Sequence, residues 1–113
     1  MKIKSYSFGK IIINNKVITS DLIIYPNRID DNWWRQKSHL LQLDDISDIL
    51  ASKPDKIIIG TGFWGLMKID KKVISKLKDL NIELIAKKTE KAVEIYNQIS
   101  SKQNIIMGLH LTC

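Results

Sequence analysis

An apolar run that ends in a glycine-rich turn stands near the middle of the chain: Lys56-Ile57-Ile58-Ile59-Gly60-Thr61-Gly62-Phe63-Trp64-Gly65. The β-branched run predicts a buried strand. A helix capped by Asp70 is expected next, with a core stripe of Val73, Ile74, Leu77 and Leu80. A second apolar run follows, Ile82-Glu83-Leu84-Ile85-Ala86. Strand, helix and strand in this order predict a right-handed crossover between parallel neighbours.

The segments on either side extend this pattern. Residues 22–25 predict another buried strand, which we expect to run parallel to the first two. Thr89 is expected to cap a last helix. Residues 104–112 are expected to form a closing strand. Near the N-terminus, Asn14-Asn15 separates two β-branched runs and indicates a tight hairpin. Residues 1–113 are therefore predicted to form a single three-layer α/β domain. Its mixed central sheet is flanked by helices, with an added N-terminal β-hairpin.

Composition excludes several classes of protein. The 113 residues carry 18 Lys and Arg against 12 Asp and Glu, a net charge of +6 that comes almost wholly from lysine. Only Arg28 and Arg35 are arginines, so nucleic-acid binding is not expected, because such proteins favour arginine forks for phosphates and base edges. The single cysteine, Cys113, can form no internal disulfide and no multi-cysteine zinc site.

The expected location is the cytoplasm. No apolar run approaches the roughly 20 residues of a membrane helix, so membrane insertion is not expected. The N-terminus enters a strand-like pattern at once, with no preceding signal core or transit helix.

The turn at residues 60–65 matches the pattern G-x-G-x-x-G, which in dinucleotide folds opens a helix. Here the next helix cap is Asp70, which is late for that motif. A structural glycine turn is therefore favoured over a dinucleotide site. An anion held by the amides of Thr61 and Gly62 remains an alternative.

A ligand site is expected where the parallel strands end. Strand exits of an open α/β sheet share one edge, and ligands bind there. Trp34, Arg35 and His39 lie in an irregular stretch after the strand at 22–25, while Thr61 and Gly62 follow the strand at 56–59. The prediction is that these two groups meet at a common edge.

The turn also carries apolar side chains that could serve a protein partner. Phe63, Trp64 and Met67 either fill a small satellite core or form an exposed apolar surface.

No catalytic pattern is visible. His39 and His110 are the only histidines, and strand geometry places His110 and Cys113 on opposite faces, which argues against a dyad. Metal-type spacing, paired carboxylates and a nucleophile elbow are also missing. The expectation is a protein without metal or cofactor, and a non-enzymatic role is favoured over an enzymatic one.

These residues resemble a small family that includes the mitochondrial complex I assembly factor three, a mammalian adipogenesis-associated protein and uncharacterised archaeal and bacterial proteins. The resemblance runs nearly end to end and rests on Tyr6-Ser7-Phe8-Gly9-Lys10-Ile11, Asp21-Leu22-Ile23-Ile24, Trp33-Trp34-Arg35, His39, Ile58-Ile59-Gly60-Thr61-Gly62, Thr89, Ala92, Tyr96-Asn97 and His110-Leu111-Thr112-Cys113. The family has Gly where this chain has Asn15 and Ser38. The resemblance implies the same three-layer fold and a role exercised through protein partners.

Two functions follow as expectations. The first is a non-enzymatic binding or assembly module that acts through a protein partner. The alternative is a small-molecule or anion-binding protein, or an enzyme, that uses a pocket at the carboxyl edge of the sheet. The oligomeric state stays open between monomer and homodimer.

Overall fold

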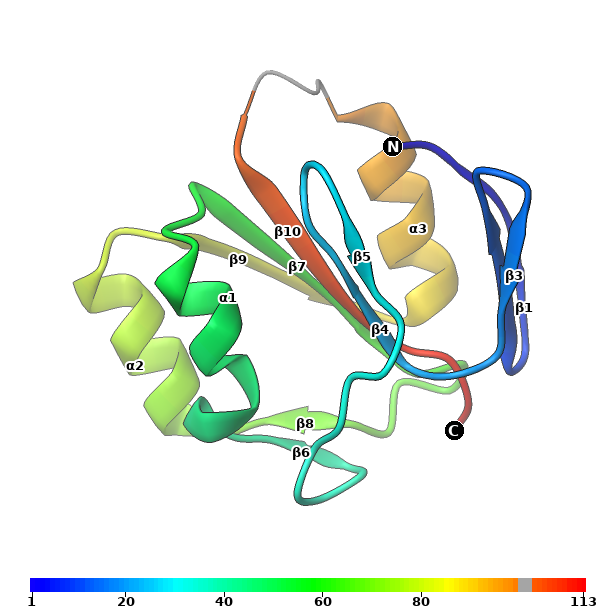
Figure 1. The fold of residues 1–113 in the computed structure, drawn as a ribbon. Helices are drawn as coiled ribbons and strands as arrows, with labels where there is room; N and C mark the ends of the chain where they lie inside the picture. The colour runs from blue at the N-terminus through cyan, green and yellow to red at the C-terminus, as the bar shows by residue number, and fades with distance from the viewer. Residues whose placement is uncertain (100–102) are drawn as a thin grey trace.

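The computed structural model describes residues 1–99 and 103–113. Within these residues the central sheet has the strand order β5-β4-β10-β7-β9 (Figure 1). The strand bounds are Ile29–Asp30 (β5), Leu22–Ile24 (β4), Ile105–His110 (β10), Lys56–Thr61 (β7) and Glu83–Lys87 (β9). Strands β10, β7 and β9 are parallel, whereas β4 is antiparallel to β10 and β5 is antiparallel to β4. The sheet is therefore mixed, as predicted.

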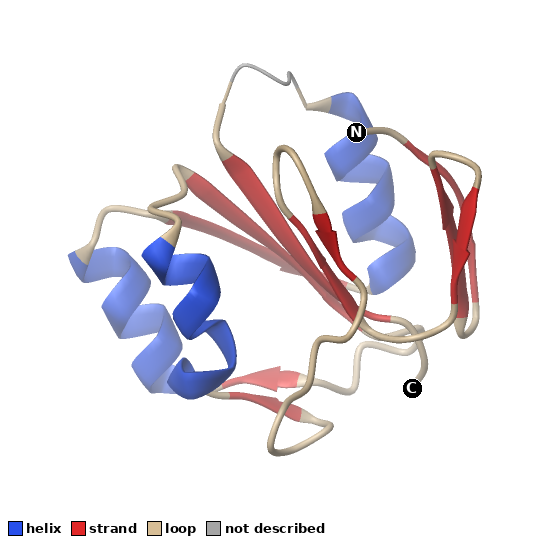
Figure 2. Ribbon diagram, viewed as in Figure 1, coloured by secondary structure: helices blue, strands red, loops and turns tan. Residues whose placement is uncertain are grey.

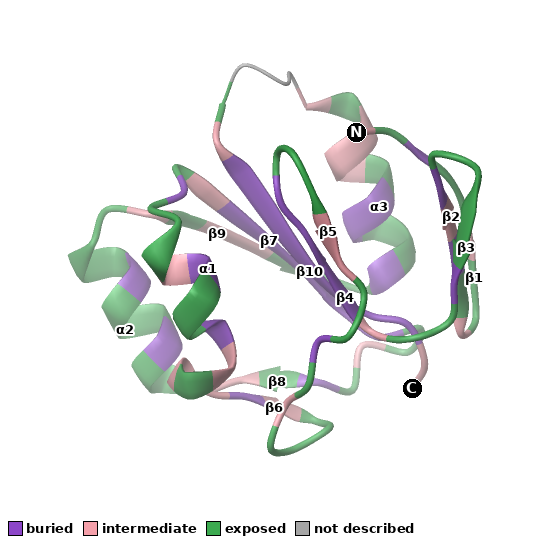
Figure 3. Ribbon diagram, viewed as in Figure 1, coloured by how far each residue is buried: buried purple, intermediate pink, exposed green. Residues whose placement is uncertain are grey.

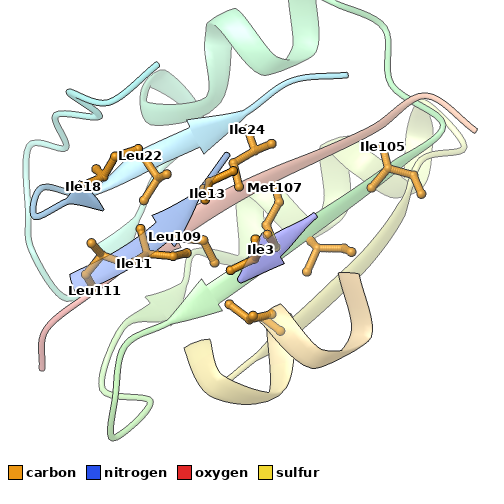
Figure 4. Close-up of a cluster of buried hydrophobic side chains, with 13 residues drawn as sticks. Ile3, Ile11, Ile13, Ile18, Leu22, Ile24, Ile105, Met107, Leu109 and Leu111 are labelled. Atoms are coloured by element: carbon orange, nitrogen blue, oxygen red, sulfur yellow. The ribbon is translucent and has the colours of Figure 1, made fainter. Parts of the chain in front are cut away.

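One face of the sheet is covered by the N-terminal strands and the last helix (Figure 2). Strands β1 (Ile3–Ser7), β2 (Lys10–Ile13) and β3 (Lys16–Ile18) form an antiparallel sheet beside α3 (Thr89–Gln98). The β2–β3 turn uses Asn14 and Asn15, whose φ angles of 51° and 64° are the left-handed values that the sequence indicated. Figure 4 shows the resulting core, in which isoleucines of β1 and β2 pack onto Leu22, Met107 and Leu109.

The opposite face is covered by the 3-10 helix η1 (Leu43–Ile46), α1 (Ser47–Ala51) and α2 (Lys71–Asp79). Ile57 and Ile59 of β7 point to this face, and Ile58 points to the other. The central strands are therefore buried on both sides, which explains why they are continuously apolar (Figure 3). The prediction of a three-layer α/β architecture with an added hairpin is confirmed.

The prediction that residues 22–25 run parallel to the other two strands is wrong. Strand β4 pairs with β10 in antiparallel register, with Ile23 opposite Gly108. The start of β4 therefore lies at the carboxyl edge of β7 and β10, and its end at Pro26 lies at the opposite edge. Strand β5 then runs back, so residues 31–39 still return to the carboxyl edge.

Two helix expectations need correction. Asp70 does cap α2, because its side chain accepts a hydrogen bond from the Lys72 amide at 2.9 Å. Of the predicted stripe, however, only Val73 and Leu77 are buried, while Ile74 and Leu80 are exposed. Thr89 is the first residue of α3 rather than its cap, and its buried side chain bonds to other segments.

A small parallel sheet not foreseen from the sequence completes the domain. Strand β6 (Leu40–Leu41) pairs with β8 (Lys68–Ile69). The pairing ties the irregular stretch before α1 to the turn that follows β7. No helix among the described residues is both long and apolar enough to cross a membrane.

Candidate functional site

A buried polar cluster lies at the carboxyl edge of β7 and β10. It consists of Asp21, at the start of β4, Arg35, in the stretch after β5, and His110, at the end of β10. The Asp21 Oδ2 atom lies 2.8 Å from Arg35 Nη2 and 2.8 Å from His110 Nδ1. The other carboxylate oxygen accepts the Leu111 amide at 2.8 Å. Three segments far apart in sequence thus meet on one carboxylate.

The short contact to Asp21 fixes the role of His110 Nδ1. A ring nitrogen can either donate a proton or accept one in the ring plane, but not both. Because Asp21 can only accept when ionised, Nδ1 carries the proton and donates to it. The 3.1 Å approach of Arg35 Nη2 to the same nitrogen is then a contact between two donors that share one carboxylate oxygen. This leaves Nε2 as the free nitrogen of His110.

The carboxylate of Asp21 is stabilised in its charged form. Burial disfavours the charge, but hydrogen bonds from His110, the Leu111 amide and Arg35, together with the charge of Arg35, outweigh the burial. The pKa of Asp21 is consequently lower than its ordinary value. The side chains of Arg35 and His110 are only 4% and 6% exposed, whereas that of Asp21 is 19% exposed, so solvent reaches the cluster at the carboxylate.

The indole ring of Trp33 packs against the guanidinium group of Arg35. The guanidinium carbon lies 4.7 Å from the centre of the indole ring, which is a cation–π distance. The indole Nε1 donates to the carbonyl of Asp45 at 3.0 Å. The six-membered ring of the indole packs against Gly108, where an added Cβ would lie 2.8 Å from two ring carbons. Only glycine at 108 therefore allows Trp33 to approach β10 this closely.

Thr89 fastens the end of β10 to the turn after β7. Its Oγ1 donates to the carbonyl of His110 at 2.6 Å and accepts the Gly62 amide at 2.9 Å. Gly62 has a φ of +106°, and a Cβ there would lie 2.9 Å from His110 Cδ2. The glycine is therefore needed both for its backbone conformation and for its contact with the imidazole.

Three polar atoms of the cluster are buried without a hydrogen-bond partner among the described residues. They are Arg35 Nε, Arg35 Nη1 and His110 Nε2. Buried polar groups are normally satisfied, so atoms of this kind mark places where a small hydrogen-bonding molecule would be stabilised. The donors of Arg35 suit an anionic or carbonyl oxygen.

A second feature is an exposed aromatic patch, formed by Phe8, Phe63 and Trp64. Phe63 lies 5.6 Å from Phe8 and 5.2 Å from Trp64 between ring centroids, with the rings edge to face. All three are exposed, Trp64 at 56%. The turn before β2 and the turn after β7, which carry these residues, are both hydrogen-bonded to the segment that follows β10 (Figure 1). The Gly9 amide donates to the Leu111 carbonyl and the Phe63 amide donates to the Thr112 carbonyl, each at 2.8 Å. A depression of about 390 Å³ lies between Phe63, Trp64 and the first turns of α3.

The structure brings together most of the residues that the sequence singled out. Arg35 reaches His110, and His110 contacts Gly62, so Arg35 and the turn after β7 lie at the same edge of the sheet. The exposed ring of His39 lies 6.1 Å from that of His110, edge to face. Thr61 is buried and donates to the carbonyl of Lys87 at 3.1 Å.

Two of the predicted residues lie elsewhere. Trp34 points to solvent at 75% exposure, and its neighbour Trp33 contacts Arg35 instead. Met67 is 2% exposed and packs in the core with Leu41 and Val73, so it cannot contact a partner at the surface.

Sequence reasoning missed Asp21 and underestimated His110. A lone carboxylate directly before an apolar strand was the available signal for Asp21. Its meaning depended on the direction of β4, which the local sequence does not specify. Among the described residues no group of three His, Cys, Asp or Glu side chains is arranged to hold a metal ion.

Comparison with solved structures shows the same fold in other organisms. The conserved hypothetical protein PH1505 of Pyrococcus horikoshii OT3 is 27% identical, with a TM-score of 0.85 and all of both chains covered. A protein of Bartonella henselae described as an outer membrane protein is 19% identical, with a TM-score of 0.81 over 98% of this chain and 94% of that one. A Bordetella pertussis protein described as a Mth938-like domain is 14% identical, with a TM-score of 0.63 over 97% of this chain and 85% of that one.

The family comparison covers nearly the whole chain. Residues 3–110 match the family described as protein of unknown function (DUF498/DUF598). The matched range includes the residues of the polar cluster, Asp21, Arg35 and His110, together with Gly62. It also includes the aromatic patch. The chain therefore belongs to the DUF498/DUF598 family.

Proposed function

We propose that this protein is a non-enzymatic binding module that acts in the cytoplasm through a protein partner, which contacts the aromatic patch. The observation that carries the proposal is the exposure of Phe8, Phe63 and Trp64 in mutual edge-to-face contact. Contiguous aromatic side chains at a surface are typical of interaction sites. The sequence resemblance to a family that contains an assembly factor supports the same function.

The surroundings of the patch indicate what the partner presents. Lys88 and Glu90 border the depression together with Lys91 and Glu94, which pair with one another at 3.3 Å. Charges of both signs therefore surround an apolar centre. This arrangement fits a protein segment that inserts an aliphatic or aromatic side chain and surrounds it with polar groups.

The test compares two exposed tryptophans. A tagged chain is expressed in its native cell and purified gently, in parallel with Trp64→Ser and Trp34→Ser. We expect a defined partner to copurify with the wild type and with Trp34→Ser, and to be reduced at least tenfold with Trp64→Ser. Circular dichroism establishes that both variants are folded. Equal recovery of the partner with all three proteins would contradict the proposal.

A second candidate function rests on the polar cluster. We propose that a small oxyanion or carboxylate binds at Arg35, beside His110. The support is the pair of buried donors without a partner among the described residues, Arg35 Nε and Arg35 Nη1. A bound oxygen would satisfy donors that are otherwise costly to bury.

Nitrogen NMR of the imidazole tests this second function. Inorganic phosphate and acetate are titrated at constant ionic strength while the His110 ring nitrogens are observed. A saturable shift of Nε2 that is lost in Arg35→Lys is expected, because lysine keeps the charge but not the Nε and Nη donors. A shift that grows linearly with every salt, chloride included, would contradict it.

A further inference from the structure

Strand β9 is the outermost strand of the central sheet on the α2 side of the molecule. It pairs with β7 along one side, in a parallel register that runs without a shift from Lys56 opposite Glu83 to Gly60 opposite Lys87. Among the described residues no strand pairs with its other side. A straight edge strand of this kind is a template for another strand.

The hydrogen bonds show which backbone groups lie on the free side. The Glu83 amide donates to Asp55, just before β7, so Glu83, Ile85 and Lys87 direct their backbone groups toward β7. The Ile82 amide donates away from β7, to Leu77 in α2. By alternation, the N–H and C=O groups of Leu84 and Ala86 point outward from the sheet.

The order of side chains along β9 is complementary to itself. When two copies of Glu83-Leu84-Ile85-Ala86-Lys87 run antiparallel about a twofold axis at Ile85, each Glu83 lies opposite Lys87 of the second copy. The same register places Leu84 opposite Ala86, the two residues with outward backbone groups. Such a pair exchanges two hydrogen bonds, so the register makes four bonds in all.

We propose that β9 pairs with β9 of a second copy of this chain in that register, to form a continuous sheet across a symmetric homodimer. Glu83 and Lys87 then occupy non-hydrogen-bonded pairs, where side chains of opposite charge are closest. Glu83 also contacts Lys56 through Oε1 at 3.6 Å, which leaves its second oxygen for the other copy. A shift by one residue would misalign both the charges and the outward backbone groups.

Apolar surface beside the edge supports the same occupant. Ile74 of α2, which was expected in the core, is 50% exposed. It lines a groove of about 490 Å³ together with Ile82 and Leu84. The side chains of Leu84 and Ala86 lie on the same face of the sheet as this groove. A second copy's strand paired with β9 would therefore cover the groove and bury Ile74. Four backbone bonds alone would be a weak interface, and this burial adds the hydrophobic part.

The decisive experiment is a charge exchange followed by sedimentation or light scattering. Glu83→Lys and Lys87→Glu each place like charges opposite one another twice, and each should weaken the dimer about tenfold. The double variant Glu83→Lys/Lys87→Glu restores opposite charges and should recover wild-type association. An equimolar mixture of the two single variants should form heterodimers. Lys16→Glu, at an exposed ion pair on the N-terminal sheet, is the matched control and should change nothing.

A backbone variant completes the test. Ala86→Pro removes an outward N–H that makes no bond to β7, so the fold should persist while dimerisation is lost. A wild-type monomer at all concentrations, or a dimer indifferent to both Lys87→Glu and Ala86→Pro, would overturn the proposal. A dimer abolished by Trp64→Ser would place the second copy on the aromatic patch instead. Failure of either proposal leaves the other intact, because the two surfaces share no residue.

Discussion

At the scale of single residues, one carboxylate organises the polar cluster. Asp21 accepts hydrogen bonds from Arg35, His110 and the Leu111 amide, each at 2.8 Å. These donors come from two segments, the stretch after β5 and the end of β10, so the side chain joins both of them to the start of β4. Such a residue stabilises the fold because its partners would otherwise be buried donors without an acceptor.

Asp21→Asn is expected to lower the free energy of unfolding by about 3 kcal/mol at neutral pH. The amide keeps the shape of the carboxylate but turns an –NH2 group toward donors, so Arg35 stays charged, buried and poorly paired. Urea denaturation measures the effect. Asp31→Asn, which removes an exposed ion pair with Lys16, is the control and should cost less than about 1 kcal/mol. Equal effects of the two changes would refute the importance of the cluster.

The lowered pKa of Asp21 also predicts the response to acid. In the unfolded chain the carboxyl titrates near 3.9, whereas in the folded protein it stays ionised to a lower pH. Its contribution is therefore complete above about pH 4 to 5 and is lost as the pH falls through the folded pKa. As the pH falls below about 5, the free energy of unfolding should therefore decrease more for the wild type than for Asp21→Asn. Urea midpoints measured at each pH would show this difference. Parallel pH profiles would contradict this assignment.

At the scale of elements, α3 is joined to the sheet through Thr89. Two segments meet at its hydroxyl, the end of β10 through the His110 carbonyl and the turn after β7 through the Gly62 amide. The sequence suggested a helix cap at this position because threonine is common there. The structure uses the same hydroxyl for tertiary bonds, and Lys88 takes the capping position without a side-chain bond.

Thr89→Val is accordingly expected to cost about 2 to 3 kcal/mol, more than the loss of a surface helix cap. Valine fits the volume but leaves a buried carbonyl and a buried amide without partners. Thr89→Ser keeps the hydroxyl and should retain most of the stability. Asp70→Ala, which removes a solvent-exposed cap, supplies the comparison at about 1 kcal/mol. Thermal unfolding followed by circular dichroism would rank the three variants. A Thr89→Val effect no larger than that of Asp70→Ala would show that the tertiary bonds add nothing.

At the scale of the whole molecule, most of the architecture could be predicted because the apolar runs, turns and crossovers are local signals. The direction of β4 could not, since it is set by pairing with β10, more than 80 residues later in the chain. Because β4 runs antiparallel to β10, Asp21 lies in the polar cluster beside Arg35 and His110. The choice between Trp33 and Trp34 was equally undecidable from sequence, because it depends on the space that Gly108 leaves on β10. Interactions between distant segments therefore account for what was missed.

The two cores on either side of the sheet share β7 and β10, and this predicts one cooperative unfolding transition. Ile58 faces the core with the N-terminal strands and α3, while Trp33 reports on the opposite core. In a Trp34→Phe/Trp64→Phe background, Trp33 is the only tryptophan, because the chain has three. Ile58→Ala should cost about 3 kcal/mol and should move the fluorescence and circular dichroism midpoints together, at a fixed protein concentration. Two separated transitions would mean that the layers unfold independently, with a central sheet too weak to couple them.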